Sequence, residues 1–333
     1  MAKTYADFMA VGDVKKMKCG EKSLDVEKTL TKAFKGSRKG DKEAEKEQFA
    51  KIVSTAMQTQ IGRDTLTELA KLGYKFAFET GEFGGFCDPA KKRIVLNPTN
   101  DFDYQLPVMV HEATHALQHE RDKSGLSEKD MEVASMLKKN RAIEADATAH
   151  EMAFLCQLKE VYPAPYEAEK KRGLPMLTAY EDAKAKTGDE DKALNAAFKS
   201  WYDCAEYRDF YDHWFTPWVG GISEEGIDND DPSRFAHALK NKDVLALCLN
   251  KGKPYVEAEF LDSDKAFSVS KSDRESIIEW TKDYADEVYG AKRDRSVYKM
   301  AVRDETGKII APAKTKAASP AVKAKIADKA KGR

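Results

Sequence analysis

Three residues in the run His111-Glu112-Ala-Thr-His115 have types and spacing that could do chemistry. On an α-helix, residues four apart are offset by only about 40° around the axis and about 6 Å along it, so both imidazoles would point the same way. Two imidazoles on one face can share a zinc ion. Glu112 would lie roughly 100° away from His111, close enough to hold a water molecule without being a ligand. A carboxylate in that place can accept a proton from water acidified by the metal, so the pattern predicts a zinc site with Glu112 as the general base.

The flanks of this run are typical of a half-buried helix. Pro107 fits a first helical turn, where its missing N–H costs nothing. Apolar residues then recur along one flank, namely Leu106, Met109, Val110, Ala113, Ala116 and Leu117. The alternative interpretation is a surface helix that carries two unrelated histidines.

A catalytic zinc needs a third protein ligand and one open position. The best candidate is Glu144, in an alanine-rich run that would let a second helix approach the first closely. It follows His115 by 144 − 115 = 29 residues, enough for a loop and a return. Asp146 is the second candidate for the third ligand; it points to another face of that helix and could instead orient a ligand. His119 lies one turn too far along for the same ion, which favours a polar supporting role, and His150 is interpreted as a packed or exposed helix residue.

Bulk composition narrows the class of protein. The chain has 333 residues, 41% of them hydrophobic, and a formal net charge of −1, which gives no global attraction to nucleic acid or to an anionic membrane. Its five cysteines form no Cys-x-x-Cys pair, which argues against a disulfide framework and for a reducing compartment. No segment approaches 18 consecutive apolar residues. We expect a cytoplasmic protein without membrane or specific nucleic-acid partners, and its oligomeric state stays open.

The residues before the histidine run predict a small set of elements. A short amphipathic helix covers 64–73, with Asp64 as its N-cap and Gly73 as its stop. The alternation in 74–79 indicates a strand, and the segments 86–87 and 93–97 indicate a hairpin around the turn at 88–92.

This succession of helix, strand, hairpin, histidine helix and carboxylate helix resembles the minimal zincin metallopeptidase fold. The runs at 93–98, 111–118 and 144–147 (the last reading Glu-Ala-Asp-Ala) resemble a family of uncharacterised bacterial putative metallopeptidases of the gluzincin type, and more distantly the ImmA/IrrE-like zincins. The resemblance covers roughly 50–215. It implies that His111, His115 and Glu144 bind zinc and that Glu112 is the general base. Thr114 stands where ImmA/IrrE-like proteins usually carry glycine.

Two further features bear on a substrate. In such folds the strand before the histidine helix offers an edge that can pair with an extended peptide, and the candidates are Ile94–Asn97 or the hairpin partner Phe86–Cys87. An aromatic block at 201–218 is interpreted mainly as core packing, because Tyr207, Tyr211 and Trp214 recur at helical spacing. Tyr202, Tyr207, Tyr211 and His213 are the candidates for a hydrogen-bond donor to the oxyanion of a tetrahedral intermediate.

The predicted fold class is α+β, a minimal zincin core made of a small sheet, the histidine helix and a second carboxylate-bearing helix, with helical extensions. Four parts are expected: a charged, partly flexible segment at 1–48, a zincin-like domain at 49–219, a mainly helical extension at 220–310, and a disordered basic tail at 311–333. The predicted function is a Zn²⁺-dependent metallopeptidase with a protein or peptide substrate. The alternatives are a zinc-binding regulatory module without general proteolytic activity and an interaction protein with incidental histidines.

Overall fold

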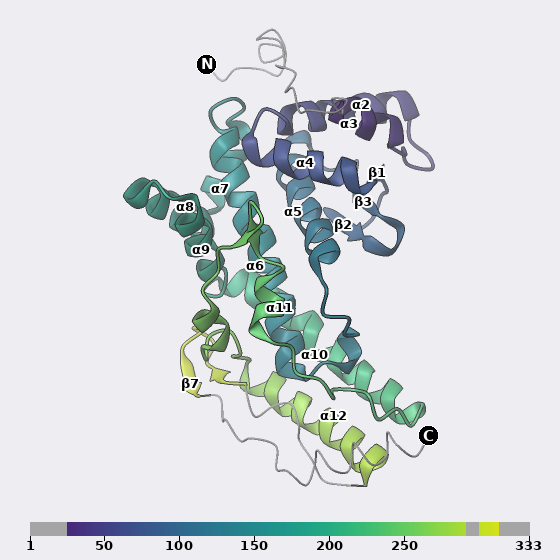
Figure 1. Cartoon of the computed structure of the whole chain (residues 1–333), viewed down its shortest axis with the longest axis vertical. Coiled ribbons are helices and arrows are strands. Elements are labelled where there is room, and N and C mark those ends of the chain that lie inside the picture. The colour runs from purple at the N-terminus through teal and green to yellow at the C-terminus, as the bar shows by residue number, and fades with distance from the viewer. Residues whose placement is uncertain (1–24, 291–299, 313–333) are drawn as a thin grey trace. The chain divides into compact units, whose positions relative to one another are not determined.

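The computed structural model describes residues 25–290 and 300–312 (Figure 1). These residues fall into two compact units, which are described separately. The first comprises the described residues up to 123 together with 142–204 and 245–256, and the second comprises 124–141, 205–244 and the described residues from 257 on. The four parts predicted from the sequence are consecutive segments, whereas these two units are each made of several segments. The predicted domain boundaries stay a prediction.

The first unit contains a three-stranded sheet. Its order is β1 (Lys75–Phe78), β3 (Arg93–Leu96), β2 (Gly85–Asp88). β1 runs parallel to β3, whereas β2 is antiparallel to it and is joined to it through the 3₁₀ turn η1 (Pro89–Lys91). The predicted hairpin is therefore confirmed. Because β3 is bonded on both sides, Ile94–Asn97 cannot offer a free edge, and that candidate for substrate pairing was wrong.

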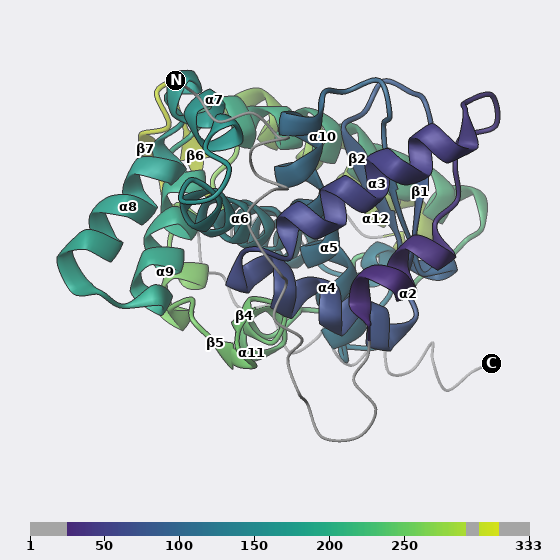
Figure 2. The ribbon, with the colours of Figure 1, turned by 90° about the horizontal axis from the view of Figure 1, so that it is seen from above.

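Three helices pack together beside this sheet, as Figure 2 shows: α2 (Val26–Ala33), α3 (Lys42–Ala56) and α4 (Gln60–Leu72). The helix predicted from residue 64 begins four residues earlier, since the Thr59 side chain, and not Asp64, accepts the capping bond from the backbone N–H of Gly62. Its predicted stop is confirmed: Gly73 has φ 79°, a left-handed conformation that glycine adopts without a steric penalty.

Helix α5 (Phe102–Arg121) carries the histidine run and packs against β2 and β3. Its N-cap is Asp101, whose carboxylate accepts a hydrogen bond of 2.8 Å from the backbone N–H of Tyr104. Pro107 therefore lies inside the helix and not in its first turn, so the predicted start was wrong. The cap signal at Asp101 determines where the helix begins, and the proline only removes one internal hydrogen bond.

The core of the first unit joins the sheet to these helices. Phe34 stacks on Phe49 with ring centroids 4.5 Å apart, and Phe49 also contacts Phe76 of β1. Met109 and Ala113 of α5 are fully buried against the same cluster. This packing fixes the rotation of α5 about its axis relative to the sheet. It therefore also sets the direction in which His111 and His115 point.

The remaining elements of the first unit include helices and one small hairpin. The long helix α6 (Val133–Leu158) contributes its part from Ala142 on. The others are α7 (Ala164–Arg172), α8 (Pro175–Thr187), α9 (Glu190–Trp201), β4 (Leu249–Asn250) and β5 (Lys253–Pro254). α8 and α9 pack against each other as a helical pair.

The second unit is built on two helices that pack together, α10 (Ala205–Asp228) and α12 (Lys271–Tyr289). Its other elements are η2 (Glu128–Asp130), α11 (Asn241–Leu245), η3 (Ala258–Asp262), β6 (Val302–Arg303) and β7 (Ile309–Ala311). In the aromatic block, Trp201 and Tyr202 are buried as predicted, but Phe210 and Trp214 on α10 are 57% and 65% exposed. The core prediction was wrong for Trp214, because the helical spacing shows that residues share a face and not what covers it.

The structure confirms an α+β fold, mostly helical with small sheets. Among the described helices, none combines the length and hydrophobicity that crossing a membrane requires. The predicted disorder of the basic tail falls mainly on residues outside the described ones, as does the first half of the charged N-terminal segment.

Candidate metal centre

Three predicted ligands converge in the first unit. His111 and His115 come from α5 and Glu144 from α6, and among the described residues they form the one group of three side chains that could hold a metal ion. The two Nε2 atoms are 3.1 Å apart. Glu144 Oε2 is 3.4 Å from the Nε2 of His111 and 3.5 Å from that of His115.

Hydrogen bonds assign the tautomer of His115. The amide N–H₂ of Gln118 donates to the backbone carbonyl of Ile143 at 2.9 Å and to Asp146 Oδ2 at 2.6 Å. Because both partners are acceptors, the amide cannot be flipped, and its Oε1 must face His115 Nδ1, 2.9 Å away. Nδ1 therefore donates, and the Nε2 of the neutral ring keeps its lone pair toward Glu144 and His111.

His111 is held in the same way by a different partner. Its Nδ1 lies 3.1 Å from Oε2 of Glu151, a carboxylate two turns after Glu144 on α6. A carboxylate accepts this bond, so Nε2 of the neutral ring again presents its lone pair to the centre. Two lone pairs that face each other across 3.1 Å repel unless a proton or a metal ion lies between them.

The group fits a zinc ion. Ligand bonds of about 2.0–2.2 Å in a tetrahedron place neighbouring ligand atoms about 3.3–3.5 Å apart, close to the three spacings of 3.1, 3.4 and 3.5 Å. Glu144 Oε2 is buried and has no hydrogen-bond donor. A buried carboxylate oxygen without a donor is costly unless a metal binds it, so this orphaned atom also favours a metal.

The charges around the site favour a cation as well. Burial would lower the pKa values of His111 and His115, but Glu144 and other carboxylates raise both above the usual range. Burial would raise the pKa of Glu144, but the two histidines hold this pKa well below the usual range. Without a metal, protons on the imidazoles would balance the carboxylates, and a metal ion would take the place of those protons.

Glu112 lies on the same helix, beside the edge strand of the sheet. Burial raises its pKa, partly offset by the neighbouring histidines. A side chain at Gly85 would not fit, because an added Cβ would come within 3.1 Å of Glu112 Cγ and 2.8 Å of Val108 Cγ1. The glycine therefore lets the backbone of β2 approach Glu112 closely.

The free edge of β2 presents backbone groups at this place. Asn97 N–H donates to the Gly84 carbonyl at 3.0 Å, and the register pairs Gly85 with Leu96. In an antiparallel ladder bonded and non-bonded pairs alternate, so Gly85 and Cys87 direct their N–H and C=O groups away from β3. Of the two candidates for substrate pairing, the segment at Phe86–Cys87 belongs to the strand whose outer side pairs with no other strand among the described residues.

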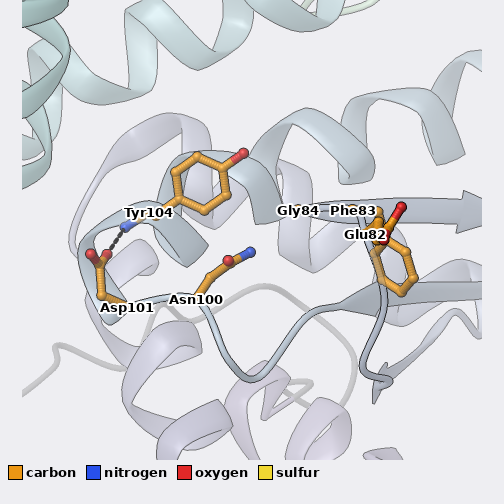
Figure 3. A pocket seen from close by; sticks show the side chains of 6 residues that line it. All are labelled: Glu82, Phe83, Gly84, Asn100, Asp101 and Tyr104. Carbon is orange, nitrogen blue, oxygen red and sulfur yellow. Dashed lines mark hydrogen bonds between the residues drawn. The ribbon is translucent and has the colours of Figure 1, made fainter.

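A shallow hollow of about 360 Å³ lies near the start of this strand (Figure 3). Its lining residues come from the loop before β2 and from the beginning of α5: Glu82, Phe83, Gly84, Asn100, Asp101 and Tyr104. Tyr104, Val108 and Glu112 follow one another at intervals of four, so they share a stripe of α5. The hollow is thus about 12 Å along the helix from Glu112.

The sequence located the three grouped residues and Glu112, whose roles stay predictions. Asp146 does not join the group; it contacts Gln118. His119 is exposed, and His150 is half-buried with Nδ1 2.9 Å from the Asp146 carbonyl. Of the candidate oxyanion donors, Tyr202 is buried in the first unit, whereas the other three, Tyr207, Tyr211 and His213, belong to the second. All four stay predicted candidates for the oxyanion donor.

Sequence reasoning missed three side chains around the group: Gln118 and Glu151 contact the two histidines, and Tyr255 contacts Asp146. Two of them carried a usable signal. Gln118 is a polar residue one turn after His115, and Glu151 is seven residues after Glu144, a spacing that returns to the same helix face. Tyr255 carried none, because it lies far along the chain.

Comparison with known proteins adds a family. Residues 27–216 match the model of a family described as "Putative metallopeptidase family (DUF6782)". Neither a search of curated proteins nor a search of solved structures returned a match. The matched residues contain all of α5 and α6, and they end before β4 and β5.

Proposed function

Because the chain belongs to the putative metallopeptidase family, we propose that it is a zinc-dependent peptidase of the zincin type in which His111, His115 and Glu144 hold the metal. The observation that carries this proposal is the convergence of two imidazole Nε2 atoms and a carboxylate oxygen without a hydrogen-bond donor. The Nδ1 atoms of the two rings are hydrogen-bonded to Glu151 and Gln118, which leaves each Nε2 lone pair free for a metal. Three protein ligands leave one position open, which is the arrangement of catalytic zinc sites.

The chemistry divides between the ion and the chain. A zinc ion bound here would polarise the scissile carbonyl and lower the pKa of a water molecule. Glu112 accepts a proton from the attacking water and passes it to the leaving amine. Its raised pKa suits both steps, because a carboxyl group that titrates closer to neutrality can hold the proton between them.

The free edge of β2 would orient the substrate. Gly85 and Cys87 can pair with the main chain of an extended peptide, which makes binding largely independent of sequence. The close approach of Gly85 to Glu112 brings a peptide paired there to the general base. A substrate side chain farther along the peptide would reach the hollow at Tyr104.

The test is a comparison of two isosteric variants on α5. Glu112→Gln should retain stoichiometric zinc and lose about 10²–10⁴-fold of the hydrolysis of a dye-quenched unfolded protein, because only the proton acceptor is removed. Glu120→Gln makes the same chemical change two turns away, at a carboxylate that pairs with Lys92, and should stay close to wild type.

Two results would contradict the proposal. One is wild-type protein that carries zinc but cleaves neither this substrate nor a peptide mixture, which would favour a zinc-binding module without proteolytic activity. The other is Glu112→Gln with unchanged turnover, which would remove the proposed general base.

A further inference from the structure

Tyr255 lies outside the residues that match the family, yet its hydroxyl contacts Asp146, two residues after Glu144 on α6. It follows β5 and is 7% exposed, and its hydroxyl donates to Asp146 Oδ1 at 2.7 Å. Its ring is set edge-on between His150, at 5.8 Å, and Phe198, at 6.3 Å. The hydroxyl is therefore directed at one carboxylate by packing on both sides.

This hydrogen bond is the outer member of a chain that ends at a proposed ligand. Asp146 accepts from Tyr255 on Oδ1 and from Gln118 on Oδ2, the latter at 2.6 Å. Gln118 in turn accepts from His115 Nδ1 at 2.9 Å. Because Asp146 carries acceptors only, it fixes the direction of the Gln118 amide and, through it, the tautomer of His115. Oδ1 of Asp146 also lies 3.4 Å from His150 Nδ1, and the Tyr255 hydroxyl, at 2.7 Å, makes the shorter contact with this oxygen.

The segment that supplies Tyr255 is anchored on the first unit at several points. Asn250 Nδ2 donates to Asp191 Oδ1 at 2.6 Å. Arg121 Nη1 donates to the Leu247 carbonyl at 3.4 Å, and the Cys248 thiol contacts the Ala142 carbonyl at 3.7 Å. The segment 245–256 thus packs against both helices that carry the proposed ligands, two residues before Glu144 on α6 and six after His115 on α5.

We propose that Tyr255 is a positioning residue for the metal ligand His115, supplied by a segment that the family match does not include. This inference rests on the metal site of the proposed function. It predicts that the hydroxyl of a residue that touches neither the metal nor the substrate sets zinc affinity, because it fixes the orientation of Asp146 and hence of Gln118.

The first experiment measures zinc affinity of the full-length protein by competition with a chromophoric chelator. Tyr255→Phe removes the hydroxyl and keeps the ring between His150 and Phe198. We expect zinc to bind about 10-fold more weakly, the low end of the effect of removing groups that support metal ligands.

The matched control is Tyr180→Phe. Tyr180 is 3% exposed in the same unit, and its hydroxyl donates to the carboxylate of Glu190 at 2.6 Å, away from the proposed ligands. This variant loses an equivalent buried hydrogen bond, so its melting temperature should fall while its zinc affinity stays at the wild-type value. The control separates loss of positioning from general loss of stability.

A double-mutant cycle tests the route through Asp146. Asp146→Asn should weaken zinc binding by itself, because an amide N–H₂ can no longer accept from both neighbours. If Tyr255 acts through this carboxylate, adding Tyr255→Phe to Asp146→Asn should weaken binding little further.

Three outcomes would overturn the inference: wild-type zinc affinity in Tyr255→Phe, an equal loss in Tyr180→Phe, or full additivity in the cycle. A wild type that binds no zinc would overturn it together with the proposed function. A wild type that binds zinc but hydrolyses nothing would remove only the peptidase assignment. Hydrolysis with unchanged affinity in Tyr255→Phe would remove only this inference.

Discussion

Each unit of the molecule buries a cluster of charged side chains, and the two clusters are built differently. In the second unit, Asp212 accepts two bonds of 2.7 Å from Nη2 of Arg141 and a bond of 2.6 Å from Arg303, whose guanidinium also donates to the Ser268 carbonyl. In the first unit, Glu144 approaches two imidazoles at 3.4 and 3.5 Å, and its Oε2 receives no hydrogen bond.

The difference separates a structural cluster from a candidate site. Both Asp212 oxygens are paired with guanidinium donors, so that cluster offers no vacant acceptor to a ligand. The cluster of the first unit has carboxylates in excess and lone pairs that face one another, an arrangement that a cation completes. Burial of charge is common to both, and the candidate site is distinguished by an unsatisfied carboxylate oxygen that lies beside two imidazole Nε2 atoms.

The largest expected effect comes from breaking the balanced cluster. Asp212→Ala leaves the buried Arg141 and Arg303 without their carboxylate and should lower the free energy of unfolding by about 3–5 kcal/mol, measured by urea denaturation. Asp209→Ala, which removes a half-exposed carboxylate from the same cluster, should cost much less. Equal losses in the two variants would contradict the view of Asp212 as the balanced centre.

The next effect concerns Glu112. Gly85→Ala would place a methyl group within 3.1 Å of Glu112 Cγ and 2.9 Å of the Val95 carbonyl, so the strand or the Glu112 side chain must shift. We expect turnover to fall by about 10²-fold while zinc content is retained, because a displacement of about 1 Å in a catalytic group has that effect. Gly221→Ala, where an added Cβ meets nothing within 4 Å, is the control. Unchanged turnover in Gly85→Ala would show that β2 does not constrain Glu112.

A smaller effect is expected from pH. The pKa values of His111 and His115 are raised in the metal-free fold, so the stability they contribute is full below the unfolded value of about 6.5 and is lost as pH rises through the folded values. Zinc requires the neutral rings and must displace these protons. The rise in melting temperature on adding zinc should therefore grow from pH 6 to pH 8, and a constant or shrinking rise would contradict the assignment.

Local sequence signals were enough to predict the helix that carries the histidines and the hairpin beside it. The His-x-x-x-His spacing has a fixed meaning on a helix, and the turn residues at 88–92 marked the hairpin that positions Gly85. Errors arose where two local signals competed, as at the start of α5, where the Asp101 cap and not Pro107 sets the boundary. They also arose where periodicity leaves open what covers a face, as at Trp214.

The side chains that contact the proposed ligands or their neighbours could not be predicted in the same way. Gln118 and Glu151 are polar residues on helices already predicted, but only the packing of α5 on α6 shows which groups they meet. Tyr255 is 109 residues from its partner Asp146, and a contact at that separation leaves no periodic trace in one sequence.

The most direct test of the central claim is the metal-to-protein ratio of protein purified from zinc-replete cells, measured for wild type, Glu144→Ala and Asp209→Ala. We predict about one zinc per wild-type chain, about one for the Asp209→Ala control, and almost none for Glu144→Ala, which keeps both imidazoles but loses the proposed third ligand. Equal zinc content in wild type and Glu144→Ala, or none in wild type, would contradict the assignment of this centre.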